Sequence, residues 1–322
     1  MRMFAALMVG AALAAGQNGA LAQAYPLKPV RVVIPFPPGA GLDVTGRLIA
    51  QRMSANLGQP FVVENRAGAG GVIGEEHVSK SPPDGYTLLF TPGSETALRM
   101  HTTRNPAIDP LKDLTPIATA VATVTCLVAR TSLPIGSLKE LIDHARRNPG
   151  KLSYGSSGIG SGQHLAGEVL KQLGVDLYHV PFKGLTAAVQ AAAADQIDLV
   201  FTNFANAQPL IQAGKLRPMA VLRDTRYAGT PEVPAMNEEM RGFSMAQSWF
   251  GFFGPRALPQ PLVQRINGEI ARVLETPELS ARMREFYLDV LITPAERMPG
   301  FVRDNSDAFG KVVKAAGIPP ID

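Results

Sequence analysis

Cysteine is almost absent from this sequence. The single cysteine, Cys126, cannot form an internal disulfide, so packing must stabilise the fold. It lies in the apolar run 121–128, which predicts a buried and unreactive thiol. Histidines are few, and neither an H-x-x-x-H motif nor a cysteine pair is present, so no metal site is expected. The histidines are scattered along the chain at His77, His101, His144, His164 and His179.

A strong charge of either sign is also lacking. The formal net charge is only +4, which is weakly suited to small anions. No basic cluster with interleaved aromatic residues occurs, so binding to nucleic acid is not expected.

Two enzyme signatures are missing as well. A dinucleotide fingerprint needs a third glycine after Gly158 and Gly160, but that position holds Gln163. No G-x-S-x-G motif surrounds Ser156, Ser157 or Ser161, so these serines are expected to contact ligand or water and not to act as nucleophiles. The sequence therefore predicts a protein without a cofactor that is not an enzyme. A hydrolase or isomerase acting on an anion remains the enzymatic alternative.

The first residues have the pattern of an export signal. Arg2 is followed by an apolar stretch, 3–15, that is shorter than the roughly 20 residues of a membrane span. Small residues then offer cleavage after Ala22 or Ala24. We expect residues 1–24 to be a signal peptide and the mature protein to be periplasmic.

The remaining chain, about 300 residues long, is expected to form two domains. Apolar runs alternate with helical patterns, which is typical of α/β folds. The chain is expected to leave the first domain and return to it, so that residues 25–122 and 247–322 form domain 1 and residues 123–246 form domain 2. This arrangement predicts a hinged, two-lobed monomer with a ligand cleft between the lobes.

Two glycine-rich segments, 35–43 and 155–162, each stand between an apolar strand and a helix start. The first N–H groups of a helix have no internal partner and carry the positive end of the helix dipole. Glycines let the backbone approach a ligand closely, so each segment can form a cradle for an anion. Two cradles on two domains predict a clamp.

Several motifs, spread over nearly the whole mature length, follow one another in the order seen in one known family. They are Pro35-Phe36-Pro37-Pro38-Gly39, Asn65-Arg66-Ala67-Gly68-Ala69-Gly70-Gly71, Pro83-Asp84-Gly85-Tyr86-Thr87, His164-Leu165-Ala166-Gly167-Glu168, His179-Val180-Pro181-Phe182-Lys183-Gly184 and Trp249-Phe250-Gly251. In their order and spacing these motifs resemble the Bug family, the periplasmic solute-binding receptors of tripartite tricarboxylate transporters. The resemblance implies a type II periplasmic binding fold, in which each lobe has a mixed, mostly parallel sheet flanked by helices. It also implies capture of a small carboxylate for membrane transporter subunits.

In this family the loop after the first strand and the glycine/serine loop of the second domain typically hold a ligand carboxylate. Here those loops are 36–43 and 156–163. The residues expected to bind ligand are Phe36, Pro38, Gly39, Ala40, Gly41, Asp43, Ser94, Glu95, Ser156, Ser157, Gly158, Gly160, Ser161, His164, Lys183, Thr202 and Asn203.

Structural alternatives remain open for several of these residues. Asp43 is favourable in a first helical turn without any ligand, and Lys183 is typical of a solvated loop. Trp249 is expected to fill the core, although it could stack on a ligand. The 65–71 loop is expected to be structural, with Gly70 and Gly71 serving close packing.

The segment 90–101 is predicted to be a loop that departs from the family pattern, because Glu95 stands where relatives usually have no acid. Glu95 could pair with an amine, accept from a protonated acid group, or face solvent. Phe90, Phe204 and Trp249 make an aromatic carboxylate as plausible as an aliphatic dicarboxylate. A sensor that presents its closed form to a signalling partner is an alternative to transport, because both use the same lobe closure.

Overall fold

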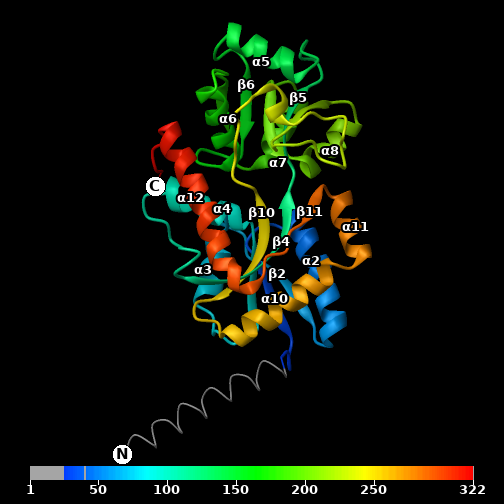
Figure 1. Ribbon diagram of the computed structural model, residues 1–322, viewed down its shortest axis with the longest axis vertical. Helices are drawn as coiled ribbons and strands as arrows, with labels where there is room; N and C mark the ends of the chain where they lie inside the picture. The colour runs from blue at the N-terminus through cyan, green and yellow to red at the C-terminus, as the bar shows by residue number, and fades with distance from the viewer. Residues whose placement is uncertain (1–24, 40, 322) are drawn as a thin grey trace, which may run out of the picture.

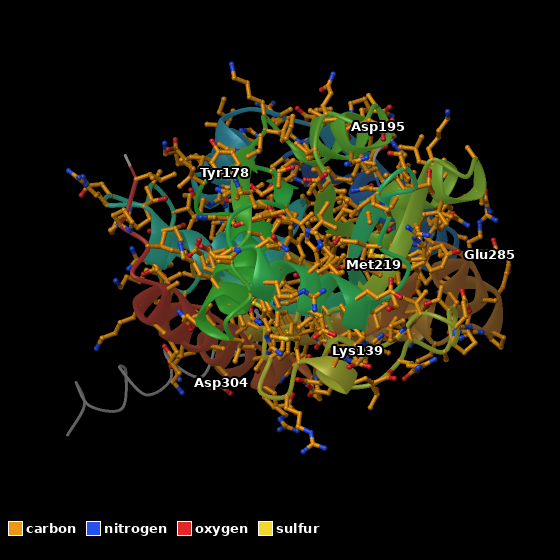
Figure 2. The ribbon with its side chains drawn as sticks, turned by 90° about the horizontal axis from the view of Figure 1, so that it is seen from above. Lys139, Tyr178, Asp195, Met219, Glu285 and Asp304 are labelled. Atoms are coloured by element: carbon orange, nitrogen blue, oxygen red, sulfur yellow. The ribbon has the colours of Figure 1, made fainter. Side chains whose placement is uncertain are left out.

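The computed structural model describes residues 25–39 and 41–321. The predicted signal peptide, 1–24, and the predicted ligand contact Ala40 lie outside the described residues. Two lobes are stacked along the long axis of the molecule, and each is built around its own sheet (Figure 1). Seen from the lobe 2 end, the charged side chains of Lys139, Glu285 and Asp304 lie at the periphery, whereas Met219 is buried within lobe 2 (Figure 2).

Lobe 1 is a six-stranded sheet in the order β11-β4-β10-β3-β1-β2. Helices cover both faces: one helical layer packs on Ile34 and Phe252, and the other packs on Leu89 and Phe253. The strands are β1 (Val30–Ile34), β2 (Phe61–Asn65), β3 (Thr87–Thr91), β4 (Leu114–Thr123), β10 (Trp249–Pro255) and β11 (Leu288–Val290). The helices are α2 (Gly41–Leu57), η1 (Ala69–Gly71), α3 (Val72–Ser79), α4 (Gly93–Thr102), α10 (Gln260–Leu274), α11 (Pro277–Glu285), η2 (Ala295–Arg297) and α12 (Met298–Ala316).

Lobe 2 is a five-stranded sheet in the order β7-β6-β8-β5-β9. One face packs against a core that includes Leu141 and Leu170, and the other against a core that includes Val189 and Phe204. The strands are β5 (Thr125–Arg130), β6 (Ser153–Ser156), β7 (Tyr178–Pro181), β8 (Leu199–Asn203) and β9 (Leu216–Val221). The helices are α5 (Leu138–Arg147), α6 (Gly162–Gln172), α7 (Leu185–Ala193), α8 (Phe204–Gln212) and α9 (Met236–Glu239).

Two crossover segments join the lobes. In the first, β4 ends at Thr123 in lobe 1 and β5 begins at Thr125 in lobe 2. In the second, the chain runs from the end of β9 through residues 243–248 to Trp249, where β10 begins. The predicted limit between residues 246 and 247 falls within the second segment, and the one between 122 and 123 falls one residue before the end of β4; both stay a prediction. Both segments lie between the sheets in Figure 1, where a hinge between the lobes would be.

The sheets are mixed, as predicted, but they are not mostly parallel. β1 is parallel to β2 and β3, whereas β10 is antiparallel to both β3 and β4. In lobe 2, β6 is parallel to β7 and β8, whereas β5 is antiparallel to β8 and β9. The strand that follows each crossover enters its sheet in the reverse direction, which explains the larger antiparallel share.

The segment predicted as a loop at 90–101 is the end of β3 followed by helix α4. Pro92, Gly93 and Ser94 are typical turn residues, and they masked the helix start. A Cβ on Gly93 would lie 2.1 Å from the Trp249 ring, so glycine is required for the helix to pack here. Helix α12 then covers α4, which shows that tertiary packing decided this element.

Trp249 fills the core, as expected. Its side chain is fully buried, and its Nε1 donates to Asn305 Oδ1 at 3.1 Å. Cys126 is also fully buried, as predicted, and burial raises the pKa of its thiol. No helix within residues 25–39 and 41–321 is long and apolar enough to cross a membrane.

Candidate functional site

The lobe 1 loop between β1 and α2 is organised by Asp43. Its Oδ2 accepts from Gly39 N at 3.0 Å and from Arg47 Nε at 2.9 Å, and its Oδ1 accepts from Asn65 Nδ2 at 2.8 Å. Burial opposes ionisation, but the hydrogen bonds from Arg47, Asn65 and Gly39 outweigh it and lower the pKa of Asp43. The carboxylate is thus committed to shaping the loop. Pro38 and Gly39 lie exposed at the tip of this loop.

The 65–71 loop supports the first loop from behind. Asn65 Nδ2 donates to Phe36 O at 3.0 Å, and a Cβ on Gly71 would lie 3.3 Å from the Phe36 ring. Gly71 therefore serves close packing, as predicted. Gly70 does not, because nothing lies within 4 Å of an added Cβ; its φ of +62° is the reason for glycine there.

Helix α4 begins at the carboxyl end of β3, beside the β1 loop. Ser94 is buried, and its hydroxyl accepts from Trp249 N at 3.4 Å. The Glu95 side chain is partly exposed and makes no hydrogen bond to the described residues. Burial raises the pKa of Glu95, Arg99 opposes this shift, and Glu75 adds to it. The Ser94 hydroxyl is thus already paired, the Glu95 carboxylate is not, and contact of either residue with a ligand stays a prediction.

The lobe 2 loop between β6 and α6 is held by its own side chains. Ser156 Oγ accepts from Gly158 N at 3.0 Å, and Ser161 Oγ donates to Gly158 O at 2.7 Å. His164 Nδ1 accepts from Gly160 N at 3.2 Å. Ser161 also caps α6, since its side chain accepts from His164 N. The amides of Gly158 and Gly160, like that of Gly39, are therefore already paired.

A histidine pair lies beneath this loop. The His164 and His179 rings are stacked with centroids 4.2 Å apart, and His179 Nε2 lies 2.7 Å from Ser156 Oγ. Burial, together with the neighbouring His164, lowers the pKa of His179 to about 4. Burial also lowers the pKa of His164, although Glu168 opposes this shift. Because its Nδ1 accepts from Gly160, His164 is neutral and carries its proton on Nε2, which faces Glu168 Oε1 at 3.7 Å. Both rings thus support the loop from below.

The remaining predicted contacts fall in different environments. Lys183 is exposed, and Thr202 is fully buried with its hydroxyl donating to Asn203 O at 3.4 Å. Asn203 is partly exposed at the start of α8, and its side chain makes no cap there. The contact of Lys183, Thr202 and Asn203 with a ligand stays a prediction.

The structure brings the predicted loops to the facing ends of the two lobes. β1 and β3 are neighbours in lobe 1, and β6 and β8 are neighbours in lobe 2, so the loops at their carboxyl ends cluster in each lobe. The lobes meet beside this region, because a Cβ on Gly160 would lie 3.1 Å from Thr102 Cβ at the end of α4. With the glycine amides paired internally, the first-turn amides of α2 and α6 remain as donors. Their contact with a ligand stays a prediction.

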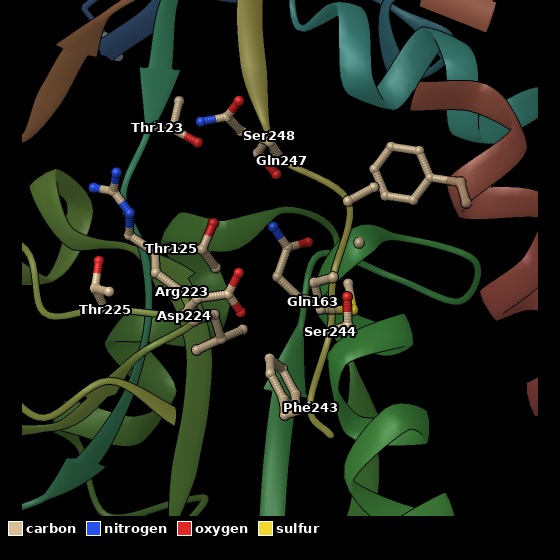
Figure 3. Close-up of a pocket in the computed structure, with 15 residues that line it drawn as sticks. Thr123, Thr125, Gln163, Arg223, Asp224, Thr225, Phe243, Ser244, Gln247 and Ser248 are labelled. Atoms are coloured by element: carbon tan, nitrogen blue, oxygen red, sulfur yellow. The ribbon is translucent and has the colours of Figure 1, made fainter. Parts of the chain in front are cut away.

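A cavity of about 340 Å³ lies between the two crossover segments, next to the α6 N-terminus (Figure 3). Its lining combines hydroxyl, amide and charged side chains with the apolar Phe243 and Phe309. Gly162 and Gln163 belong to the predicted loop 156–163, whereas sequence reasoning missed the crossover residues, because the crossover segments have no glycine motif. The alternating polar and apolar residues at 243–248 carry no signal that separates them from an ordinary linker. The polar residues that matter most here are Thr123, Gln163, Arg223 and Asp224.

No group of three or more histidine, cysteine, aspartate or glutamate residues in the part of the chain that the structure describes could hold a metal ion. The loops and the cavity present backbone amides, hydroxyls, side-chain amides and carboxylates. The amides and hydroxyls can bind an anion and close over it.

Comparison with known proteins identifies the family. Residues 45–318 match the model of the tripartite tricarboxylate transporter family receptor. The chain belongs to this receptor family. It is 32% identical to Protein BugT of Bordetella pertussis over 300 residues, which cover 92% of this chain and 91% of that protein.

Solved structures of the same type share this fold. The periplasmic binding protein BugD superposes with a TM-score of 0.81 at 31% identity, covering 92% of this chain and 100% of that one. An R. palustris protein solved with adipate gives a TM-score of 0.85 at 32% identity, with the same coverage. MatC from Rhodopseudomonas palustris, solved with bound malate, gives 0.77 at 30% identity and covers 90% of this chain and 100% of that one. The predicted family and its two-lobed periplasmic binding fold are confirmed.

Proposed function

We propose that this receptor captures a small organic carboxylate between its lobes and delivers it to the membrane subunits of a tripartite tricarboxylate-type transporter. The observation that carries the proposal is the pair of facing loops, each placed at the carboxyl ends of two neighbouring strands and each followed by a helix N-terminus. Receptors of similar structure that were solved with adipate and with malate support a carboxylate as the ligand. The family supports a periplasmic protein exported by the signal peptide 1–24.

The lobe 1 and lobe 2 loops supply binding energy in the same way. Each hydrogen bond from an N–H group to a carboxylate contributes about 1.5–3 kcal/mol before the entropy of association is subtracted. Four bonds at the strong end of this range sum to about 12 kcal/mol, and an association cost of about 4 kcal/mol leaves about 8 kcal/mol, which corresponds to micromolar affinity. No arginine inside the cleft is needed for this affinity.

The ligand favours lobe closure because the hydrogen-bond donors that bind it are divided between the two lobes. A carboxylate bound by only one lobe leaves the donors of the other lobe solvated, and closure adds their bonds. The paired amides of Gly39, Gly158 and Gly160 keep both loops in shape before the ligand arrives, which lowers the cost of ordering them. The transporter then has a closed form to recognise.

A ligand screen tests the proposal. The mature protein is heated with aliphatic dicarboxylates, aromatic carboxylates, hydroxy acids and amino acids, and positive compounds are titrated by calorimetry. A ligand that binds only the folded state raises the melting midpoint by mass action. Binding of one carboxylate class in the micromolar range supports the proposal; binding of neutral or cationic solutes alone contradicts it. Recovery of the bound compound unchanged after long incubation separates a receptor from an enzyme.

A further inference from the structure

The cavity between the crossover segments contains polar groups that nothing in the protein satisfies. Thr123 is 8% exposed, and its Oγ1 has no hydrogen-bond partner among the described residues. Gln163 is also 8% exposed; its Oε1 accepts from Ser157 Oγ at 2.8 Å, but its Nε2 donates to none of the described residues. Figure 3 shows the Thr123 hydroxyl and the Gln163 amide pointing into the space between the two crossover segments. Leaving the buried Thr123 hydroxyl unpaired costs about 1–3 kcal/mol, which an occupant would recover.

The same cavity reaches the binding loop of lobe 2. Gly162 and Gln163, the first two residues of α6, line it, and their amides have no partner within the helix. A carboxylate held at this helix end would therefore have its remaining atoms directed into the cavity. The volume of about 340 Å³ lies within the range of small-molecule pockets, about 300–1000 Å³.

The charges around the cavity define the occupant. Arg223 is its one lining cation among the described residues, and Nη1 of this guanidinium donates to Asp289 Oδ2 at 2.7 Å. Asp224 also lines the cavity, where its Oδ1 accepts from Asn237 Nδ2 at 2.6 Å. The single guanidinium is already paired with Asp289, and Asp224 adds a carboxylate to the lining, so no positive charge is left over to balance a second carboxylate of the ligand. Phe243 and Phe309 add apolar surface.

We propose that this hinge cavity binds the tail of the captured carboxylate and selects a tail that is neutral, partly apolar and able to hydrogen-bond, such as one ending in a hydroxyl. The inference rests on the proposed function and narrows its ligand class. Thr123 and Gln163 belong to different lobes, so a tail that bonds both of them also holds the lobes together. Binding of the tail would thereby favour the closed form.

Three acids of equal chain length test the inference: 6-hydroxyhexanoate, hexanoate and adipate. Each is titrated by calorimetry into the mature wild-type protein, into Thr123→Val and into Thr131→Val. The Thr123 substitution keeps the branched shape and removes only the unpartnered hydroxyl. Thr131 is the matched control, because it is exposed and its hydroxyl donates to Gly214 O at 3.0 Å, away from the cavity.

We expect the wild type to bind 6-hydroxyhexanoate more tightly than either other acid. Thr123→Val should weaken that affinity about three- to tenfold, the value of one neutral hydrogen bond, and leave the affinity for hexanoate unchanged. Thr131→Val should behave as wild type. If adipate binds best, or if the hydroxyl preference survives in Thr123→Val, the cavity does not select a neutral tail.

A second variant, Gln163→Leu, keeps the test decisive if Thr123→Val does not fold. It should reduce the preference for the hydroxyl over the apolar tail by a similar factor, and an unchanged preference would again overturn the inference. Failure of the proposed function gives a different result, because then no carboxylate of the broad screen binds to the wild type. Carboxylate binding without any tail preference refutes the hinge cavity alone.

Discussion

Acidification should destabilise this protein through His179. The ring is partly buried against His164 and Tyr154 and pairs with Ser156, and its pKa is lowered to about 4. In the unfolded chain a histidine titrates near 6.5. Above about pH 6.5 both states are neutral and His179 adds no pH dependence. As the pH falls from about 6.5 towards about 4, His179 becomes protonated in the unfolded state but stays neutral in the folded state, so the free energy of unfolding falls.

The size of the effect follows from the separation of the two pKa values. At pH 5 the ideal loss is about 2 kcal/mol, and partial solvent access to the ring reduces it to about 1–2 kcal/mol. We expect urea unfolding of the mature protein to show this extra loss between pH 7.5 and pH 5. The variant His179→Gln should lose that much less over the same interval, because its side chain cannot take up a proton.

Comparing the variant with the wild type isolates the contribution of His179 to the pH dependence of stability, because the carboxylates contribute equally in both proteins. His144→Gln serves as the control, since His144 lies on α5, away from the loop. It should lose stability as the wild type does. If His179→Gln and the wild type fall in parallel with pH, the buried ring is not the cause and the argument from burial is wrong.

Three further predictions concern the loops and their supports. Gly41→Ala should change the free energy of unfolding by less than about 1 kcal/mol in a urea titration, because an added Cβ meets nothing within 4 Å. Its carboxylate affinity, measured by calorimetry, should fall at least about tenfold. Unchanged affinity would mean that the first turn of α2 is not part of the site. Gly93→Ala should cost about 2–3 kcal/mol in the same urea assay, since its Cβ would lie 2.1 Å from Trp249, and a neutral result would contradict the packing of α4. Arg99→Met should lower the free energy of unfolding by about 3–5 kcal/mol, because it removes the partner 2.6 Å from the buried Glu75 carboxylate. The double variant Glu75→Gln with Arg99→Met should recover part of this loss. No recovery would mean that the broken ion pair is not the cause of the destabilisation.

The choice of Gly41 reflects what the structure adds to the glycine argument. Gly39 and Gly158 have φ values of +90° and +135°, so any side chain there strains the backbone as well as approaching a ligand. Loss of binding in those variants would be hard to separate from loss of structure. The sequence showed where glycines cluster, whereas the backbone angles show which of them can be tested cleanly.

Local sequence signals determined much of the fold. The sequence Ser137-Leu138-Lys139-Glu140 has the pattern of a capping box, and Ser137 does cap α5, with its hydroxyl accepting from Glu140 N at 3.2 Å. The Glu140 carboxylate accepts from Gly136 N and not from the cap residue. Strand β1 and helix α2 also follow directly from an apolar run and an amphipathic pattern. These signals depend on residues close together in the chain, so they can be recognised without knowing which distant residues the element packs against. The family resemblance extended them to two lobes and a carboxylate ligand.

Tertiary structure decided what depends on distant residues. Helix α4 packs against Trp249, far along the chain, which leaves room only for glycine at the start of the helix. Asp43 shapes its loop through Asn65, and Ser156 is held by His179 from a neighbouring strand. The hinge cavity exists only where Thr123 of one crossover meets Gln163 and the other crossover. Sequence alone determined most of the elements, because these follow from local pattern. The unpaired groups of the hinge cavity were set by packing between segments that are distant in the chain.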